Sequence, residues 1–212
     1  MGKIFYILGK SSTGKDTIYK NILEDETLGL KDIILYTTRP IRDGETDGKS
    51  YHFVSEKEYE DIKKSGLIIE ERSYNTMHGV WRYFTVKDSS IDLSNNNYVI
   101  IGVLKSFIDT RDYFGSDKVV PIYIEVEDGL RLQRALNREK KPENRRFKEL
   151  CRRYLADSED FSEDKIKDAG IDKRFENVDL SSCINEVKEY IRKNRWFYGW
   201  NENNIRYADK SG

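Results

Sequence analysis

The sequence predicts an α/β fold in which helices cover a mainly parallel β-sheet. Three short apolar runs, at residues 3–8, 98–103 and 119–126, have the length and composition of buried parallel strands. Segments with helical spacing of their apolar residues alternate with these runs, as in βαβ units. Residues 36–88 break the alternation, so we expect an inserted lobe of antiparallel strands and one helix there.

Each expected element follows from a local pattern. The run 3–8 ends at a glycine loop, and an amphipathic helix follows it in KDTIYKNILE. A Ser-x-x-Glu capping box begins a helix at 55–65, and a glycine closes it. The other expected strands are 32–38, 67–74, 78–86, 98–103, 119–126 and the edge strand 173–179; a charged helical stretch at 127–161 is broken near Pro142, and a closing helix covers 181–193.

The 212 residues fit a single domain. We expect its core at about 1–35 and 89–191, the inserted lobe at about 36–88, and an aromatic tail at 194–212. This tail either packs against its own domain or forms a partner surface.

The composition excludes several classes of protein. Lys and Arg number 37 and Asp and Glu 38, so a net charge of −1 provides no general attraction to nucleic acid or to a membrane surface. The two cysteines have no metal-ligand spacing, and no apolar run approaches transmembrane length. We therefore expect a cytoplasmic protein without nucleic-acid or membrane partners, whose oligomeric state does not follow from the sequence.

Residues 8–17, LGKSSTGKDT, nearly match the phosphate-binding pattern G-x-x-x-x-G-K-[ST]. The glycines let backbone N–H groups converge on phosphate oxygens, the helix N-terminus adds partial positive charge, and Lys15 neutralises the β- and γ-phosphates. A tight strand-to-helix turn with a chance Gly-Lys is the alternative. The residues expected to bind the donor nucleotide are Gly9, Ser12, Thr13, Gly14, Lys15, Asp16 and Thr17.

A second loop, TTRPIRDGETDGKSYHFVS, places Arg39 and Arg42 three residues apart, followed by Glu45 and Tyr51. Two guanidinium groups on one loop suit a phosphate monoester, because each can pair with it bidentately. A tyrosine hydroxyl can complete the coordination. The residues alone equally suit a charged, solvated loop.

The order T-T-R-x-x-R-x-G-E-x-x-G-x-x-Y-x-F-V-S after a phosphate loop strongly resembles the guanylate kinase family, and the resemblance runs from residue 3 to about 191. It implies a three-layer P-loop core, an acceptor-binding insertion, ATP and Mg²⁺ as cofactors, and a nucleoside monophosphate as acceptor. It also implies that Arg39, Arg42 and Tyr51 hold the acceptor phosphate with support from Glu45. Glu70 would read the N1 and N2 edge of guanine, and an exposed strand carboxylate is the alternative.

The segment RLQRALNREKKPENRRF resembles the helical lid of the family, expected here at about 134–153. Arg134 and Arg138, four residues apart, lie on one helix face and could reach the donor phosphates together with Arg153; each of these arginines suits a solvated helix face equally well. Asn177, in FENVDL, is implied to lie near the adenine. The catalytic set that the resemblance implies is Lys15, Arg39, Arg134, Arg138 and Arg153.

Four features of the family pattern are missing, at five positions. Asp16 replaces the loop hydroxyl, and Ile101 and Val103 replace the two acids of a D-x-D at the end of a strand. Leu35 and Phe84 stand where the family has hydroxyls in its base pocket, with Thr85 beside the second position. We hypothesise that Asp16 supplies the magnesium-side charge that the strand has lost. The order G-K-D-[ST] also resembles loops in some viral deoxynucleotide kinases and in ribose 1,5-bisphosphate phosphokinases, whose strand also lacks the D-x-D. An Asp at a helix N-terminus is also simply a stabilising cap.

These observations predict an ATP-dependent nucleoside-monophosphate kinase acting on GMP or dGMP with magnesium. A kinase of another phosphorylated metabolite, of the ribose bisphosphate type, is an alternative that Asp16, Leu35 and Phe84 favour. A non-catalytic guanylate-kinase-like binding module is a third, which the missing strand acids favour and Lys15 argues against.

Overall fold

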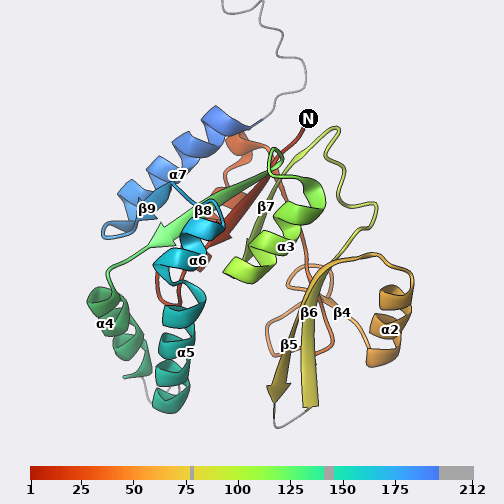
Figure 1. Cartoon of the computed structure of the whole chain (residues 1–212), viewed down its shortest axis with the longest axis horizontal. Coiled ribbons are helices and arrows are strands. Elements are labelled where there is room, and N and C mark those ends of the chain that lie inside the picture. Colours follow the sequence, from red (N-terminus) through yellow and green to blue (C-terminus); the bar gives the residue numbers. More distant parts are fainter. Residues whose placement is uncertain (77–78, 141–145, 196–212) are drawn as a thin grey trace, which may run out of the picture.

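The computed structural model describes residues 1–76, 79–140 and 146–195, and its core is a five-stranded sheet of parallel strands in the order β2-β7-β1-β8-β9 (Figure 1). The central strand β1 is buried along its whole length, because its neighbours β7 and β8 flank it and helices cover both faces. The strands are β1 (Ile4–Leu8), β2 (Leu30–Asp32), β7 (Asn97–Gly102), β8 (Val119–Glu125) and β9 (Arg174–Glu176).

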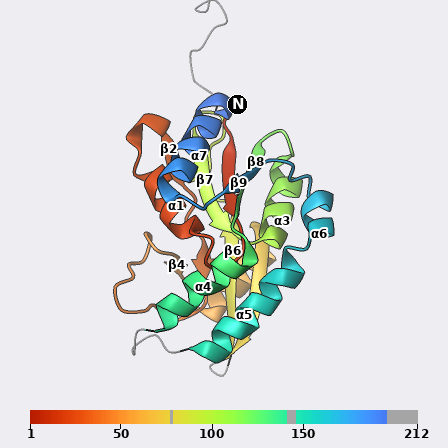
Figure 2. The same ribbon diagram turned by 90° about the vertical axis from the view of Figure 1, so that its left-hand side faces the viewer.

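Helices cover both faces of this sheet and complete three layers (Figure 2). Helices α3 (Leu104–Phe114) and α6 (Glu163–Asp168) pack on one face through a cluster that includes Tyr6, Phe107 and Ile166. On the other face, α1 (Lys15–Leu23) and α7 (Leu180–Asn194) pack through a cluster that includes Phe5 and Val187; the short 3-10 helix η1 (Glu26–Leu28) follows α1. No described helix is long and apolar enough to cross a membrane.

A second sheet, in the order β4-β3-β6-β5, forms a small lobe at one side of the core (Figure 1). It contains β3 (Tyr36–Thr37), β4 (His52–Phe53), β5 (Ile68–Thr76) and β6 (Gly79–Val86), with α2 (Glu56–Lys64) packed against it. The capping box of α2 is present as expected: Ser55 accepts from the Glu58 N–H, and the Glu58 carboxylate accepts from the Ser55 N–H. The expected antiparallel pair is β5–β6, but β3 and β4 pair in parallel, so the lobe has a mixed sheet.

Two further helices, α4 (Asp128–Glu139) and α5 (Phe147–Asp160), lie side by side below the core sheet, facing the small lobe (Figure 1). They form the helical stretch that the sequence predicts at 127–161. The expected break near Pro142 and the tail from residue 196 onward lie outside the described residues.

Two sequence predictions need correction. The single strand expected at 32–38 is two strands, because the chain leaves the core sheet after Asp32 and joins the small lobe at Tyr36, burying Ile33 and Leu35 between them. Helices α3 and α6 were not expected. Charged and aromatic residues are mixed along α3, and α6 has only six residues, so neither has a clear local signal.

Candidate nucleotide-binding site

The loop after β1 has the backbone shape of a phosphate cradle. Ser12 and Gly14 adopt left-handed conformations, with φ of 67° and 87°, and α1 begins directly at Lys15. Successive N–H groups in such a turn face a common point, and the N-terminus of α1 adds partial positive charge there. The Lys15 side chain lies in the same hollow as Gly9 and Ser12. The loop therefore has the geometry that the sequence predicts for binding phosphate.

Asn177 supports this loop through a hydrogen bond to its backbone. Its side-chain Nδ2 donates to the Thr13 carbonyl at 2.7 Å, and a Cβ at position 14 would lie 2.4 Å from the same nitrogen. Gly14 is therefore required by close approach as well as by its φ. The Asn177 carbonyl accepts a hydrogen bond from Arg134 Nη2 at 2.9 Å. In this structure Asn177 and Arg134 thus brace the phosphate loop.

The other two lid arginines reach the loop itself. Arg153 Nη2 donates to Ser11 Oγ at 2.9 Å, and Arg138 Nη2 donates to Ser12 Oγ. Arg134 and Arg138 thus come from one helix, as their spacing predicts, but they contact different parts of the site. Arg138 and Arg153 line the hollow where donor phosphates would lie.

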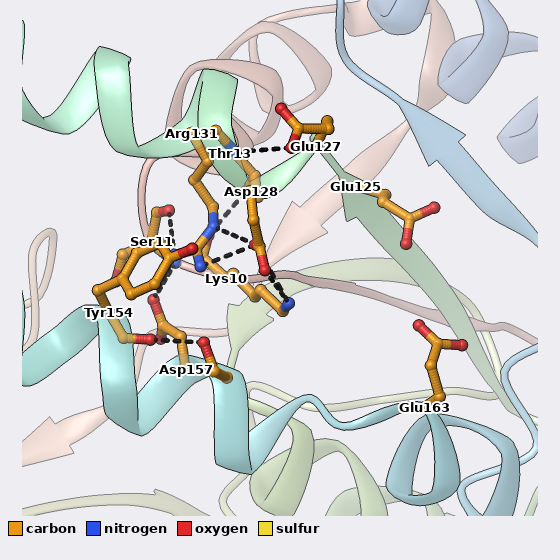
Figure 3. Close-up of polar contacts among 12 residues, drawn as sticks. Lys10, Ser11, Thr13, Glu125, Glu127, Asp128, Arg131, Tyr154, Asp157 and Glu163 are labelled. Atoms are coloured by element: carbon orange, nitrogen blue, oxygen red, sulfur yellow. Dashed lines mark hydrogen bonds and ion pairs between the residues drawn. The ribbon is translucent and has the colours of Figure 1, made fainter.

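An ion network around the buried Arg131, which the sequence did not predict, joins helices α4 and α5 to the loop (Figure 3). Arg131 is only 2% exposed and binds Asp128 Oδ1 at 3.0 and 2.9 Å through Nε and Nη2, and Asp157 Oδ2 at 3.2 Å through Nη1. Asp157 Oδ2 also accepts from the Ser11 backbone N–H at 2.7 Å, while Lys10 Nζ pairs with Asp128 at 3.3 Å. The one local sign of this network in the sequence is the i, i+3 spacing of Asp128 and Arg131.

The arginine loop is organised by one bidentate pair. Arg39 is 4% exposed, and its Nη1 and Nη2 donate to the two oxygens of Glu45 at 2.7 and 2.5 Å. Glu45 also accepts from the Arg42 backbone N–H at 2.9 Å. Hydrogen bonding to Arg39 lowers the pKa of Glu45 to about 2, and the same bond raises the pKa of Arg39. Glu45 therefore supports Arg39, as the resemblance implies.

Other side chains of the small lobe line the same hollow as the phosphate loop. Arg42 lies with its guanidinium 5.7 Å from the Trp81 ring centroid, and the Arg39 guanidinium lies 5.1 Å from that of Tyr51. Burial raises the pKa of the Tyr51 phenol, which therefore stays protonated at neutral pH. Arg42, Tyr51 and Tyr83 line the hollow together with Lys15.

The third correction concerns which residue occupies the position where a hydroxyl group is expected in the base pocket. Phe84 faces away from Glu70, and its ring packs against Tyr59 in the lobe core. Thr85 instead pairs across the sheet with Glu70 and donates its hydroxyl to Glu70 Oε1 at 2.8 Å. A register irregularity between Ile68 and Glu70 accounts for the difference, because a slip of one residue exchanges the two faces of a strand. Glu70 is buried, not an exposed strand carboxylate.

These residues surround two adjoining hollows, of about 800 Å³ and about 400 Å³. The larger lies between the phosphate loop, the small lobe and the lid helices. The smaller is lined by Lys15, Asp16 and Leu35, with an apolar wall from Ile101 and Val103. The residues that replace the family acids thus do line the site.

Asp16 is an acid that lines the smaller hollow next to Lys15, where it could serve a metal ion. Its carboxylate is 86% exposed and lies 3.8 Å from Lys15 Nζ. Within the described ranges no group of three or more His, Cys, Asp and Glu residues is arranged to hold a metal. Mg²⁺ is usually held by one or two carboxylates together with substrate phosphates, and a single exposed Asp16 fits that requirement.

Known proteins match the N-terminal part of this chain most clearly. The family model described as guanylate kinase matches residues 1–98. The guanylate kinase of Lactiplantibacillus plantarum is 40% identical over 73 residues, which are 34% of this chain and 35% of that protein. The guanylate kinase of Neisseria gonorrhoeae is 44% identical over 69 residues, 32% of this chain and 33% of its relative. The chain thus spans about a third of the length of the curated relatives it matches.

The fold comparison extends over most of the chain. The crystal structure of guanylate kinase from Anaplasma phagocytophilum superimposes with a TM-score of 0.64, covering 92% of this chain and 88% of that one at 18% identity. The predicted fold class, an α/β fold with a mainly parallel core sheet and a small inserted lobe with its own sheet, is therefore confirmed. The sequence matches also confirm the resemblance to the guanylate kinase family.

Proposed function

From this relation to the guanylate kinases, we propose that the chain is a phosphotransferase that moves the γ-phosphoryl of ATP onto a nucleoside monophosphate, with GMP or dGMP as the leading acceptor. The observation that carries the proposal is the placement of two phosphate-binding elements around one hollow. The loop of Gly9–Lys15 lies on one side, and Arg42, Tyr51 and Tyr83 lie on the other. A donor and an acceptor phosphate held there would face each other.

The chain would act mainly by positioning and by neutralising charge. Phosphoryl transfer requires little covalent chemistry from the protein, because the reacting oxygens need only to be aligned and their developing charge stabilised. The loop N–H groups and Lys15 would hold the donor. Arg42 and Tyr51 would hold the acceptor phosphate, with Arg39 locked in place by Glu45. Arg138 and Arg153 would exchange their loop serines for phosphate oxygens.

We also propose a role for each of the parts of the chain that surround the site. Residues 36–88 would bind the acceptor, and the helices of about 134–153 would act as a lid that excludes water. Asn177, which donates to the loop carbonyl of Thr13, would keep the donor side in shape.

Magnesium, when bound, would supply positive charge that offsets the negative charge of the donor phosphates. Asp16 is the residue of this chain that we propose as its protein ligand, with Thr17 beside it. The donor set suits the ion because a carboxylate oxygen is a hard ligand and phosphate oxygens supply others.

The test is turnover with a panel of acceptors. ATP and Mg²⁺ are incubated with GMP, dGMP, IMP, AMP, CMP, UMP and ribose 1,5-bisphosphate, and ADP formation is measured. We expect ADP above background with GMP or dGMP. Turnover with ribose 1,5-bisphosphate alone would favour the metabolite-kinase alternative, which Leu35 and the apolar wall of Ile101 and Val103 support. ATP binding without turnover of any acceptor would favour a non-catalytic module.

A further inference from the structure

Arg72 is a partly buried cation at the junction of the two hollows, and neither the phosphate loop nor the arginine loop accounts for it. It lies on β5 two residues after Glu70, and residues two apart share one face of a strand. Its cross-strand neighbour is Tyr83. The side chain is 15% exposed, and Arg72 lines both hollows together with Lys15, Tyr51 and Val103.

Arg72 and Glu70 form an incomplete pair. Arg72 Nε lies 3.9 Å from Glu70 Oε2, which is too far for a hydrogen bond. Among the described residues, neither of these two buried atoms has a hydrogen-bond partner, whereas Glu70 Oε1 accepts from Thr85. Buried polar atoms without partners are costly, so an unpartnered donor on a residue that lines both hollows, next to an unpartnered carboxylate oxygen, indicates contacts that a ligand supplies.

A carboxylate next to a guanidinium is complementary to one edge of guanine. The carboxylate accepts from two donors, N1–H and N2–H, while the guanidinium donates to the adjacent O6 and to N7. Leu35, which stands where the family resemblance places a hydroxyl on the O6 side, has no donor to offer. Arg72 lies beside the buried Glu70 and is a donor that lines both hollows.

We infer that Arg72 is a specificity-determining residue that donates to O6 and N7 of the acceptor guanine while Glu70 accepts from N1 and N2. This inference rests on the proposed function, because it concerns the acceptor of the same reaction. Adenine presents an amino group where guanine has O6 and an unprotonated N1 where guanine has a donor. With adenine, both Arg72 and Glu70 would therefore meet groups of the wrong kind. Hypoxanthine lacks only the N2 donor and should bind with intermediate affinity.

The test is equilibrium binding of GMP, IMP and AMP, measured by calorimetry on the full chain. The variants are Arg72→Met, which removes the donors, and Arg72→Lys, which keeps the charge beside Glu70 but loses the bidentate fork. Arg82→Met is the matched control: it removes an arginine from β6 whose guanidinium pairs with Glu56 and lies over the Tyr59 ring, away from both hollows. Thermal unfolding of each variant verifies that it is folded.

In the wild type we expect GMP to bind more tightly than AMP. In Arg72→Met this preference should fall by about tenfold to a hundredfold, the discrimination that one bidentate base contact provides. Arg72→Lys should lose an intermediate part, and Arg82→Met should lose none. If Arg72→Met does not fold, Arg72→Lys decides by itself: a base-specific loss supports the inference, and unchanged preference overturns it.

Other outcomes overturn the inference. An equal loss of affinity for GMP, IMP and AMP would mean that Arg72 contacts the phosphate. A loss of the preference for GMP over IMP would mean that Arg72 acts only by holding Glu70, because these two bases share O6 and N7 and differ at N2. A wild type without preference for GMP over AMP would also contradict it. Turnover measured on the same samples separates the two proposals: base-selective binding without ADP formation refutes the kinase activity alone, and turnover with unchanged base preference in Arg72→Met refutes the role of Arg72 alone.

Discussion

Asp157 accepts a hydrogen bond from the Ser11 backbone N–H at 2.7 Å, so a carboxylate of helix α5 is joined directly to the phosphate loop. The same oxygen pairs with the buried Arg131 of α4, as Figure 3 shows. One acid therefore connects both lid helices to the loop whose shape decides phosphate binding. This connection has consequences for stability and for nucleotide affinity together.

Asp157→Ala should lower both the stability of the fold and the affinity for the nucleotide. Breaking a buried ion pair costs about 3–5 kcal/mol, but Arg131 keeps Asp128 here, so we expect the free energy of unfolding to fall by about 2 kcal/mol. The KM for ATP should rise because the Ser11 N–H loses its anchor. Urea unfolding and turnover measure the two effects. Glu159→Ala, an exposed acid on the same helix, is the control, and equal behaviour of the two variants would refute the prediction.

Lys15→Met should abolish most of the turnover while the chain stays folded. Lys15 lies in the hollow, and within the described part of the chain its one ion pair is with Asp16, which is largely exposed, so little stability depends on it. Loss of one charge that stabilises the transition state lowers kcat by about a hundredfold to a thousandfold. Lys20→Met, which removes an exposed lysine of the same helix, should retain activity. Comparable kcat values for the two variants would contradict the role of Lys15.

Glu45→Gln tests the bidentate pair through its pH dependence. The pKa of Glu45 in the folded protein is about 2, below its usual 4.5, because Arg39 hydrogen-bonds the ionised form. The stabilisation is therefore complete above about pH 4.5 and is lost as the pH falls through about 2. At pH 7 the variant should be less stable by about 1–3 kcal/mol, since Arg39 loses its charged partner.

The difference in unfolding free energy between wild type and Glu45→Gln should accordingly become smaller as the pH falls from 4.5 to 2. Denaturant unfolding of both proteins across this range provides the measurement. A gap that stays constant down to pH 2 would show that the charge of Glu45 contributes nothing to the pair.

Asp16→Asn tests the relocated metal ligand. We expect the Mg²⁺ concentration for half-maximal turnover to rise by about tenfold, the change that 1.4 kcal/mol of lost interaction produces. Asp25→Asn is unsuitable as a control because Asp25 pairs with Lys188; Glu24→Gln, an exposed acid at the end of the same helix α1, is suitable. Unchanged magnesium dependence of nucleotide binding and turnover would make Asp16 a helix cap only.

Much of the site could be predicted because its signals are local. The phosphate loop is ten consecutive residues whose glycines, lysine and flanking strand and helix all lie within reach of one turn. Arg39 and Glu45 lie six residues apart, so a single loop brings them together. The capping box of α2 is likewise a pattern of four residues.

Other features could not be predicted because their partners are distant in the chain. Arg131 reaches Asp157 across 26 positions, and Asp157 reaches Ser11 across 146. The exchange of Phe84 for Thr85 depends on a bulge in β5, which shifts register without leaving a signal in the alternation of apolar residues.

The sequence by itself determined the fold class, the two loops that we propose bind phosphate and the identity of the residues that depart from the family pattern, since each depends on spacing along a short stretch of chain. Tertiary structure alone decided which of those residues face one another. It turned Thr85 and not Phe84 toward Glu70, buried Arg131 between two acids, and placed Arg72 beside the carboxylate at the cavity wall. The physical reason is that strand register and burial set these neighbours, and both depend on the packing of the whole chain.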